Sequence, residues 1–363
     1  MISNQILQNT IDGLKAISRV DFVVMDTDGN EVAATVAKEE GDFKGAVRDF
    51  VKSPADSQEF SNYQFFKIYD EQVTEYILVV IGAGEDSYMV GKMAAFQLQG
   101  LMVAYKERFD KDNFIKNLLL DNLLRVDIYS RSKKLHIPTE AKRTVMIVEP
   151  YGSKESNMLE LVRGYFGAGS KDFITAVDEN SVVIVKEVQE ADIRAEMEKT
   201  ALGIKTLLER EGISHIHVAY GNIVNEIKEV SRSYKEAKMA MDVGKIFFEE
   251  RGVIAYSELG IGRLIYQLPI PLCKMFIGEI FGGKSPDDFD EETITTIHKF
   301  FENSLNVSET SRQLFIHRNT LVYRLDKLQK STGLDLRVFE DAITFKIALM
   351  VVKYMKYMEN FDY

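Results

Sequence analysis

Residues 306–328 allow few structures other than two helices joined by a tight turn. Ser308 can cap a short helix that reaches Leu314, and a second helix begins at His317 or Asn319 after a three-residue turn. Three leucines of the second helix, spaced by four and three residues, form one buried stripe: Leu321, Leu325 and Leu328. A short helix, a tight turn and a longer helix make a helix-turn-helix, whose second helix enters the major groove of DNA.

The other face of the second helix carries side chains that can bind DNA. Arginine can bind guanine through two hydrogen bonds, asparagine can bind adenine, and threonine can contact a phosphate or a thymine methyl group. The residues expected at the bases are Arg318, Asn319, Thr320, Tyr323 and Arg324. Those expected at phosphates are Arg312, Lys327 and Lys330. The alternative structure is a helical hairpin with an ordinarily charged outer face.

The charge distribution favours a local contact with nucleic acid over general polyanion binding. The chain holds 45 basic and 56 acidic residues, a formal net charge of −11. Residues 304–337 hold six basic and three acidic residues, a net +3, whereas residues 1–105 hold eight basic and 16 acidic residues, a net −8. A small basic segment in an acidic protein is typical of a local nucleic-acid contact. The first 105 residues are therefore not expected to bind DNA.

Upstream of the helix-turn-helix the sequence predicts an α+β protein of several domains. Residues 1–105 have the order helix, hairpin, loop, hairpin, helix, which is typical of an antiparallel-sheet sensor domain of the PAS or GAF kind. Residues 106–142 are expected to form a helical linker. Residues 143–258 have a βαββαβα order with a central hairpin, which predicts a ferredoxin-like or cyclase-like α+β domain. Residues 259–363 are expected to be nearly all helical and to carry the helix-turn-helix. Residues 282–288, within this region, are the clearest linker of the chain.

Two of the upstream helices carry apolar patterns that constrain packing. The first helix is expected to bury Ile6, Leu7, Ile11, Leu14 and Ile17. A long helix from about Gly91 to Leu124 has apolar residues dense enough to need a partner surface. That surface is either the chain's own domains or the same helix of a second copy, and both readings stay open.

The sequence from Leu305 to Leu325 resembles the C-terminal helix-turn-helix of the purine catabolism and carbohydrate diacid (PucR/CdaR) regulators, and the resemblance is closest over Ile316–Leu325. Residues 230–240 resemble the closing helix of that family's central domain, a relative of the GGDEF fold. Residues 3–105 resemble its diacid-recognition domain more faintly. The resemblance implies a transcription regulator with a sensor, a GGDEF-like connector and a DNA-binding output.

The central domain is expected to be a degenerate GGDEF-like domain without enzyme activity. Diguanylate cyclases place Gly-Gly-Asp-Glu-Phe at the central hairpin, where the glycines let substrate approach and the acids hold metal. The matching hairpin here is Ala176-Val-Asp-Glu-Asn-Ser-Val182, which keeps Asp178 and Glu179 but lacks the glycines. Its tip has ordinary turn chemistry. His215 and His217 lie on one side of a strand and are interpreted as packing and edge residues, so neither a metal nor a cofactor is expected.

The resemblance to diacid-recognition domains implies a carboxylate effector. Those domains carry an arginine and a histidine ahead of a Gly-Ala pair, and here Gly45-Ala46 is present while Phe43 replaces the histidine. Three lysines could pair with a carboxylate: Lys38, Lys44 and Lys67. Since the domain is acidic, solvated surface lysines are the alternative reading, and the identity of the effector stays open.

These patterns together predict a ligand-responsive transcription regulator of a catabolic operon for a small organic acid or related metabolite. Its expected partners are a double-stranded DNA operator, a small-molecule effector and a second copy of the chain in a homodimer or higher homo-oligomer. No apolar run approaches the roughly 18 residues of a membrane span, and no secretory signal is visible, so a cytoplasmic location is expected. Two alternatives remain, a protein-interaction scaffold that does not bind DNA and a nucleotide cyclase.

Overall fold

A computed structural model of the chain describes residues 2–36, 43–150, 157–167, 170–189, 193–281 and 289–359. The chain divides into two compact units. The first comprises Met1–Ile115 with Lys134–His136, and the second comprises Lys116–Lys133 with Ile137–Tyr363.

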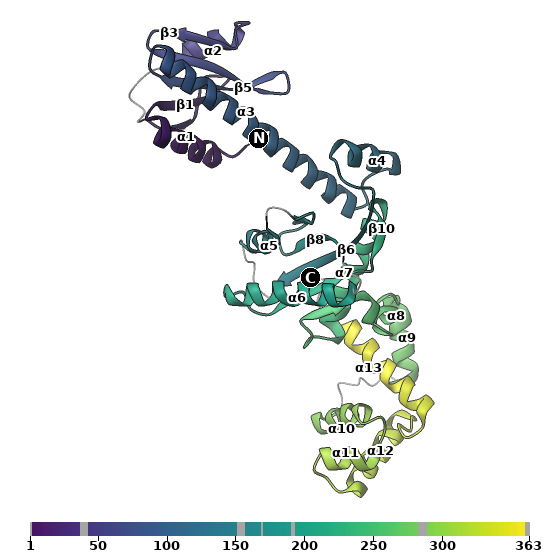
Figure 1. The fold of residues 1–363 in the computed structure, drawn as a ribbon. Coiled ribbons are helices and arrows are strands. Elements are labelled where there is room, and N and C mark those ends of the chain that lie inside the picture. The colour runs from purple at the N-terminus through teal and green to yellow at the C-terminus, as the bar shows by residue number, and fades with distance from the viewer. Residues whose placement is uncertain are drawn as a thin grey trace. The chain divides into compact units, whose positions relative to one another are not determined.

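The first unit is an antiparallel sheet with helices on both faces. The strand order is β2-β1-β5-β4-β3. The strands are β1 (Asp21–Asp26), β2 (Glu31–Ala34), β3 (Ser57–Phe60), β4 (Tyr63–Asp70) and β5 (Val73–Ile81). The helices α1 (Asn4–Ser18) and α3 (Glu85–Leu119) pack on one face, and α2 (Lys44–Lys52) packs on the other (Figure 1). Because side chains alternate along a strand, Val24 and Phe66 join the first core while Val23 and Phe65 join the second.

The two predicted hairpins and the closing helix of the first unit are confirmed. The predicted burial of Ile17 is wrong, because this side chain is exposed and lies about 120° around α1 from the buried Ile11. The stripe of α1 that faces the sheet is therefore narrower than the sequence pattern suggests. The segment expected as a loop contains α2 and β3 within its described part.

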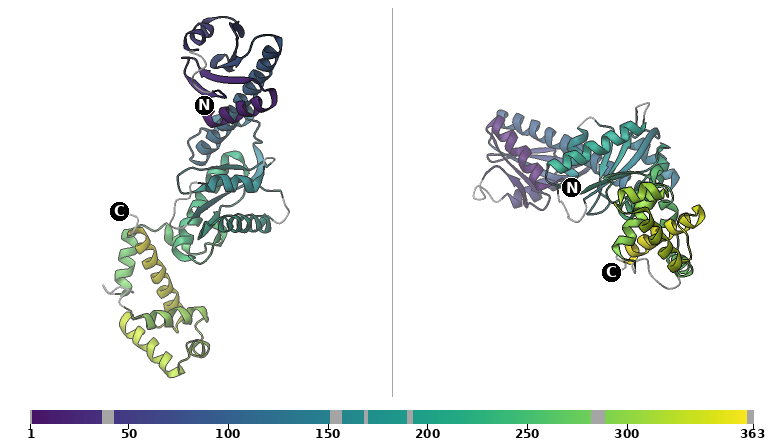
Figure 2. Two further views of the ribbon diagram at one scale, coloured as in Figure 1. Left: turned by 90° about the vertical axis from the view of Figure 1, so that its left-hand side faces the viewer. Right: turned by 90° about the horizontal axis from the view of Figure 1, so that it is seen from below.

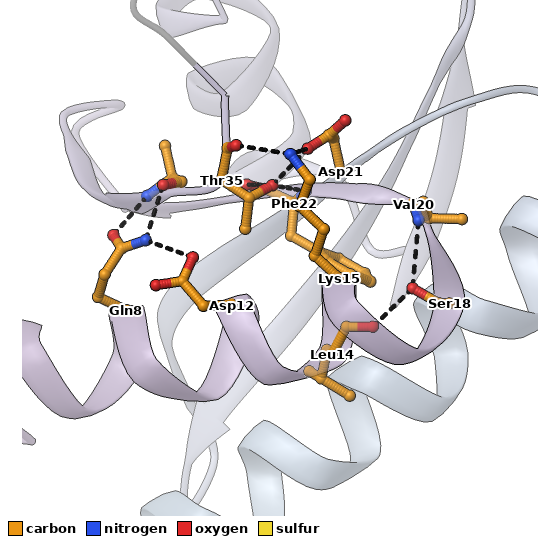
Figure 3. A network of polar contacts seen from close by, with 10 residues as sticks. Gln8, Asp12, Leu14, Lys15, Ser18, Val20, Asp21, Phe22 and Thr35 are labelled. Carbon is orange, nitrogen blue, oxygen red and sulfur yellow. Dashed lines mark hydrogen bonds and ion pairs between the residues drawn. The ribbon is translucent and has the colours of Figure 1, made fainter.

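The helix α1 is fixed to the edge of the first sheet by polar side chains as well as by its apolar stripe (Figure 3). The side-chain amide of Gln8 donates to the Ala34 carbonyl at 2.8 Å and accepts from the Ala34 amide at 3.0 Å. Lys15 donates to the Thr35 carbonyl at 2.9 Å and pairs with Asp21, whose carboxylate also accepts from the Thr35 hydroxyl at 2.7 Å. Gln8 thus occupies both hydrogen-bonding groups of one β2 residue at the free edge of that strand.

The second unit begins in the last turn of α3, continues with α4 (Arg125–Lys134) and is built around a larger sheet. Its strand order is β11-β9-β6-β8-β7, and β10 pairs with β6. The strands are β6 (Glu140–Pro150), β7 (Phe173–Thr175), β8 (Val182–Glu187), β9 (Ile216–Tyr220), β10 (Val224–Glu226) and β11 (Val253–Ala255). The helices α5 (Met158–Phe166) and α6 (Ile193–Arg210) pack on one face, and α7 (Val230–Phe247) packs against β6 and β9. The predicted βαββαβα order is confirmed, with β10 and β11 as additions.

The C-terminal part of the second unit is helical, as predicted. Its helices are α8 (Gly262–Tyr266), α9 (Ile270–Phe281), α10 (Glu291–Glu302), α11 (Val307–Gln313), α12 (Arg318–Thr332) and α13 (Phe339–Glu359). The helix α13 lies alongside α9 (Figure 2). Its residues Phe345 and Ala348 belong to the core around α12, and Val351 and Tyr354 belong to a second core that includes Ile246 of α7. One helix therefore joins the helix-turn-helix to the central domain.

The α+β multidomain class is confirmed, with an antiparallel-sheet first domain, a mixed central domain and a helical C-terminal part. The boundaries at residues 105, 142 and 258 stay predictions, and the linker at residues 282–288 lies outside the described residues. No described helix is both long enough and apolar enough to cross a lipid bilayer.

Candidate nucleic-acid interface

The helices α11 and α12 begin at polar caps. The side chain of Asn306 accepts from the Ser308 and Glu309 amides at 3.0 and 3.1 Å, so Asn306 caps α11 and the expected cap Ser308 lies inside the helix. A capping side chain accepts from the amides of the second and third residues after it, and for Asn306 these residues are Ser308 and Glu309. His317, one of the two predicted starts of the second helix, caps α12, and its Nδ1 accepts from the Asn319 amide at 3.2 Å.

The two helices pack closely because one contributes leucines and the other contributes small side chains. Leu321, Leu325 and Leu328 are buried, which confirms the predicted stripe. On α11, Thr310 and Ser311 are buried and small enough to let α12 approach. Between the helices, Leu314 and Ile316 pack into the core.

Phe315, in the turn between the helices, is an exposed residue that no sequence pattern indicated. It has a left-handed backbone with φ of 54° and an almost fully exposed ring. Glycine adopts this conformation more easily, and residues held in it often occur at functional sites. The sequence gives only an indirect sign of this exposure. Leu314, Phe315 and Ile316 are three consecutive apolar residues in a tight turn, and only Leu314 and Ile316 pack against the core.

The first turn of α12 presents its polar side chains to solvent. Arg318, Asn319 and Thr320 are exposed, and Tyr323 is exposed one turn later. In the part of the chain that the structure describes, the Arg318 side chain has no hydrogen bond or ion pair. Four of the five residues expected at the bases are therefore accessible in the first two turns of the helix, where backbone amides also favour phosphate.

Arg324 lies elsewhere than expected. Its side chain is only 18% exposed, donates to the Thr296 hydroxyl at 3.0 Å and pairs with Glu292, both on α10. The guanidinium therefore joins α12 to α10 instead of standing beside Arg318 on the accessible face. Its position on the margin of the apolar stripe explains this, because α10 covers that margin.

The residues expected at phosphates are exposed, but they differ in their partners. Arg312 forms two hydrogen bonds to Glu309, at 2.6 and 3.1 Å, and this guanidinium lowers the pKa of Glu309 below its usual range. The Lys327 ammonium lies 3.9 Å from the Asp290 carboxylate. Among described residues, Lys330 has neither a hydrogen bond nor an ion pair. The positive charge open to a phosphate is therefore concentrated at Arg318 and Lys330.

Two segments of the chain match known domain families. Residues 293–351 match the family of PucR C-terminal helix-turn-helix domains, and residues 121–243 match the family of GGDEF-like domains. The chain carries a PucR helix-turn-helix. The helix-turn-helix match includes the capping residues Asn306 and His317, the leucine stripe of α12 and the exposed first turn of that helix. The GGDEF-like match begins before α4 and ends inside α7.

The chain is also similar to curated bacterial regulators. It is 25% identical over 255 residues to the carbohydrate diacid regulator of Escherichia coli (strain K12), which covers 66% of each chain. It is 30% identical over 170 residues to the DNA-binding transcriptional activator AdeR of Bacillus subtilis (strain 168), covering 45% of this chain and 40% of AdeR. It is 25% identical over 135 residues to the purine catabolism regulatory protein of the same organism, covering 36% of this chain and 25% of that protein. The matched region thus spans two thirds or less of the length of each relative.

The central hairpin of the GGDEF-like domain uses its aspartate to build the turn. One carboxylate oxygen of Asp178 accepts from the Asn180 amide at 2.9 Å, from the Ser181 amide at 2.8 Å and from the Ser181 hydroxyl at 2.9 Å. At the end of the neighbouring β6, the carboxylate of Glu149 pairs with Lys245 of α7. Among the described residues no three His, Cys, Asp or Glu side chains are grouped so as to hold a metal ion.

The structure describes two of the three candidate effector lysines. Lys67 donates to the Ser53 carbonyl and lies over the Phe50 ring, 5.2 Å from its centre, so it joins β4 to the α2 side of the sheet. Lys44 is the exposed first residue of α2. Lys38 lies outside the described residues.

Proposed function

We propose that this chain is a ligand-responsive transcription regulator that binds an operator through α12 and controls catabolism of a small organic acid or related metabolite. The observation that carries the proposal is the exposed polar turn at the start of α12, within a helix-turn-helix of the PucR family. The names of the relatives support it, since they include regulators of carbohydrate diacid and purine catabolism. As a DNA-binding regulator the protein acts in the bacterial cytoplasm.

In this proposal Arg318, Asn319, Thr320 and Tyr323 contact bases. The side chains of Lys327, Lys330 and Arg312 contact phosphates, where charge matters more than geometry. Arg324 is a positioning residue that fixes α12 on α10 through Glu292 and Thr296.

The test is a comparison of two arginine variants on selected and random DNA. The full chain is first used to select its preferred duplex from a random pool. Arg318→Ala should then weaken binding to the selected duplex by about 1–3 kcal/mol and reduce discrimination. Arg337→Ala is the control, because Arg337 is paired with Asp326 in the middle of α12 and with Asp335 after its end, so its loss should leave discrimination unchanged. If the chain bound no duplex at low salt, the proposed DNA-binding function would be wrong, and the alternative of a protein-interaction scaffold would replace it.

We further propose that the GGDEF-like domain connects the other domains without catalysis. The engagement of Asp178 in its own turn and of Glu149 with Lys245 supports this, because both carboxylates are already used within the fold. Incubation with GTP and Mg²⁺ should give no cyclic or dinucleotide product. Product formed by the chain and abolished in Asp178→Asn would establish the cyclase alternative.

The first domain is the proposed effector site, and its ligand is a small molecule such as a carboxylate. An effector changes DNA binding only if it binds two states of the protein with different affinity. Ligand at 100 times its dissociation constant should stabilise the domain by about 2.7 kcal/mol. Thermal melts of the full chain against glycerate, glucarate, galactarate and allantoate, with purines and amino acids as controls, would identify the class. Lys44→Ala should reduce the response to an acid if that lysine pairs with it, and a response to purines alone would remove the carboxylate.

A further inference from the structure

The helix α3 is apolar on two opposite sides, and only one of them is covered in the first unit. Ala94 and Leu98 are buried against the sheet. About 180° around the helix from Leu98, a second row of large apolar side chains is 53% to 81% exposed. This row, the outer stripe of α3, consists of Met89, Met93, Phe96 and Val103. A helix with apolar residues on both sides needs two partner surfaces.

The spacing of the outer stripe favours another helix as the missing surface. Its members follow one another by four, three and seven residues, and Gly100 divides the last interval into four and three. This is the 3.5-residue repeat by which two helices keep one seam in contact. A side chain at Gly100 would meet no atom of this chain within 4 Å, so the stripe has a hollow at one repeat position. A large ring such as Phe96 of an opposing helix can fill a hollow of this kind.

The charges beside the outer stripe favour a second copy of the same helix. Residues 89–104 contain a single charged residue, Lys92. In a parallel pair, Lys92 would face the uncharged Gln97 of the second copy, so no like charges meet along the stripe. Beyond it, Lys106 is already paired with Asp70 and Glu71 at 2.7 and 3.0 Å, and Lys111 is paired with Glu107 at 2.6 Å. A strongly charged partner would find nothing on this surface to pair with.

We propose that the outer stripe of α3 is the interface between two copies of this chain, with the two α3 helices parallel. The inference deepens the proposed function by naming the surface that brings two helix-turn-helix domains to one operator. It does not depend on DNA binding, because the stripe lies in the first unit.

The first test is the oligomeric state of the full chain, measured by analytical ultracentrifugation from 0.1 to 50 micromolar. We expect a dimer whose dissociation constant rises at least tenfold in Phe96→Glu and in the second stripe variant Met93→Glu. Phe109→Glu is the matched control, because Phe109 is 62% exposed on the same helix but about 140° from Phe96. A monomeric parent, or a dimer that both stripe variants leave intact, would overturn the proposal. Since these side chains are exposed, circular dichroism should show each variant folded.

The second test is the direction of the pair. Cysteines introduced one at a time as Met89→Cys and Val103→Cys should each form a disulfide-linked dimer under mild oxidation, because equivalent positions face each other in a parallel pair. Phe109→Cys should not, and the parent's Cys273 is buried. Failure of both stripe cysteines to cross-link would exclude the parallel pair.

The two proposals fail separately. Arg318→Ala should remain a dimer while losing discrimination between duplexes, and Phe96→Glu should keep binding to a single half-site while losing the gain from a second one. A dimer that binds no DNA would refute the function alone, and a DNA-binding chain that stays monomeric would refute the α3 interface alone.

Discussion

At the residue scale, pairing within the domain decides which cations can reach DNA. Arg312 and Arg337 are held by acids of the helix-turn-helix region, and Arg324 is held by α10. The surplus of positive charge along residues 304–337 therefore overstates what a phosphate meets. Arg318 and Lys330, which lack such partners among the described residues, should dominate the salt dependence of binding.

Glu309→Gln should strengthen DNA binding. The substitution removes a carboxylate that repels phosphate and releases the exposed Arg312 from its ion pair. Affinity should rise by a similar factor on selected and random duplexes, and the slope of log affinity against log salt should steepen by about one. Titrations of labelled duplex at several salt concentrations measure both. Glu359→Gln, at the end of α13, is the control, and an unchanged slope would mean that Arg312 does not reach a phosphate.

The stability that the Asp21 carboxylate contributes to the first domain should be lost in acid. Burial raises its pKa, but hydrogen bonds from Lys15 and Thr35 outweigh that effect and lower the pKa below 3.8. A carboxyl with a lowered folded pKa contributes stability above its unfolded value, and that stability is lost as the pH falls through the folded pKa. Denaturant unfolding between about pH 5 and pH 3 should show a smaller acid loss in Asp21→Asn than in the parent. Equal losses would show that the Lys15 pair does not contribute.

The sequence predicts some residues well and others poorly, for a physical reason. The leucine stripe of α12 follows from spacing alone, because the helical period fixes which side chains share a side. The partners of Arg324 do not follow, since Thr296 and Glu292 lie 28 and 32 residues away along the chain. Periodicity shows which side a residue takes, whereas tertiary contacts decide what covers it.

At the scale of elements, the caps and side-chain amides set where helices begin and how they dock. Asn306→Ala should lower the free energy of unfolding of the helix-turn-helix by about 1 kcal/mol, because two α11 amides lose their acceptor. Ser308→Ala is the matched control, and its effect should be close to zero because its hydroxyl caps nothing. Thermal or urea unfolding of both variants measures the difference. Equal effects would restore Ser308 as the cap.

Gln99 docks α3 onto the first sheet by two hydrogen bonds. Its amide accepts from the Tyr69 amide at 2.8 Å and donates to the Tyr69 carbonyl at 2.6 Å, beside an irregularity in the β4–β5 register. In Gln99→Glu a carboxylate would face that carbonyl, which should cost about 1–3 kcal/mol at neutral pH. The facing carbonyl would raise the folded pKa of the new carboxyl, so the loss should shrink as the pH falls through that value. A pH-independent loss would point to packing. Gln58→Glu, exposed on β3 of the same sheet, is the control.

Short elements were the ones that the sequence did not reveal. The strands β3, β10 and β11 have three or four residues, and β3 is an exposed edge strand without alternation. Their pairing with neighbours defines them more than their own composition does. Longer elements such as the nine-residue β5 belong to the predicted hairpins, because a long apolar run leaves little choice.

At the scale of the whole molecule, salt should act on the two proposed interfaces in opposite directions. DNA binding should weaken with added salt, since counterions are released when cations meet phosphates. The α3 dimer should tighten, because residues 1–105 carry a net −8 and salt screens the repulsion between two such domains. Ultracentrifugation without DNA and duplex titration with DNA, each from low to physiological salt, separate the two effects. A dimer that dissociates as salt rises would mean that ion pairs hold it.

The order of domains followed from the sequence, whereas their coupling did not. The change from alternating patterns to helical ones marks where the sheet-containing parts end. That α13 shares one core with α12 and another with α7 depends on contacts between distant segments, and no local pattern encodes them.

The polar attachment of α1 bears on how this protein avoids joining other sheets. An open edge strand is a template on which another chain can add a strand, and such growth ends in fibres. Gln8 closes one such position by occupying the amide and the carbonyl of Ala34. A proteolytic cut after Ser18 would release α1 and with it the Gln8 side chain that occupies this edge. It would also expose the apolar face of the sheet that Leu7 and Ile11 cover. Protein cleaved at this point should therefore aggregate, and it should be recovered as insoluble assemblies rather than as a smaller folded domain.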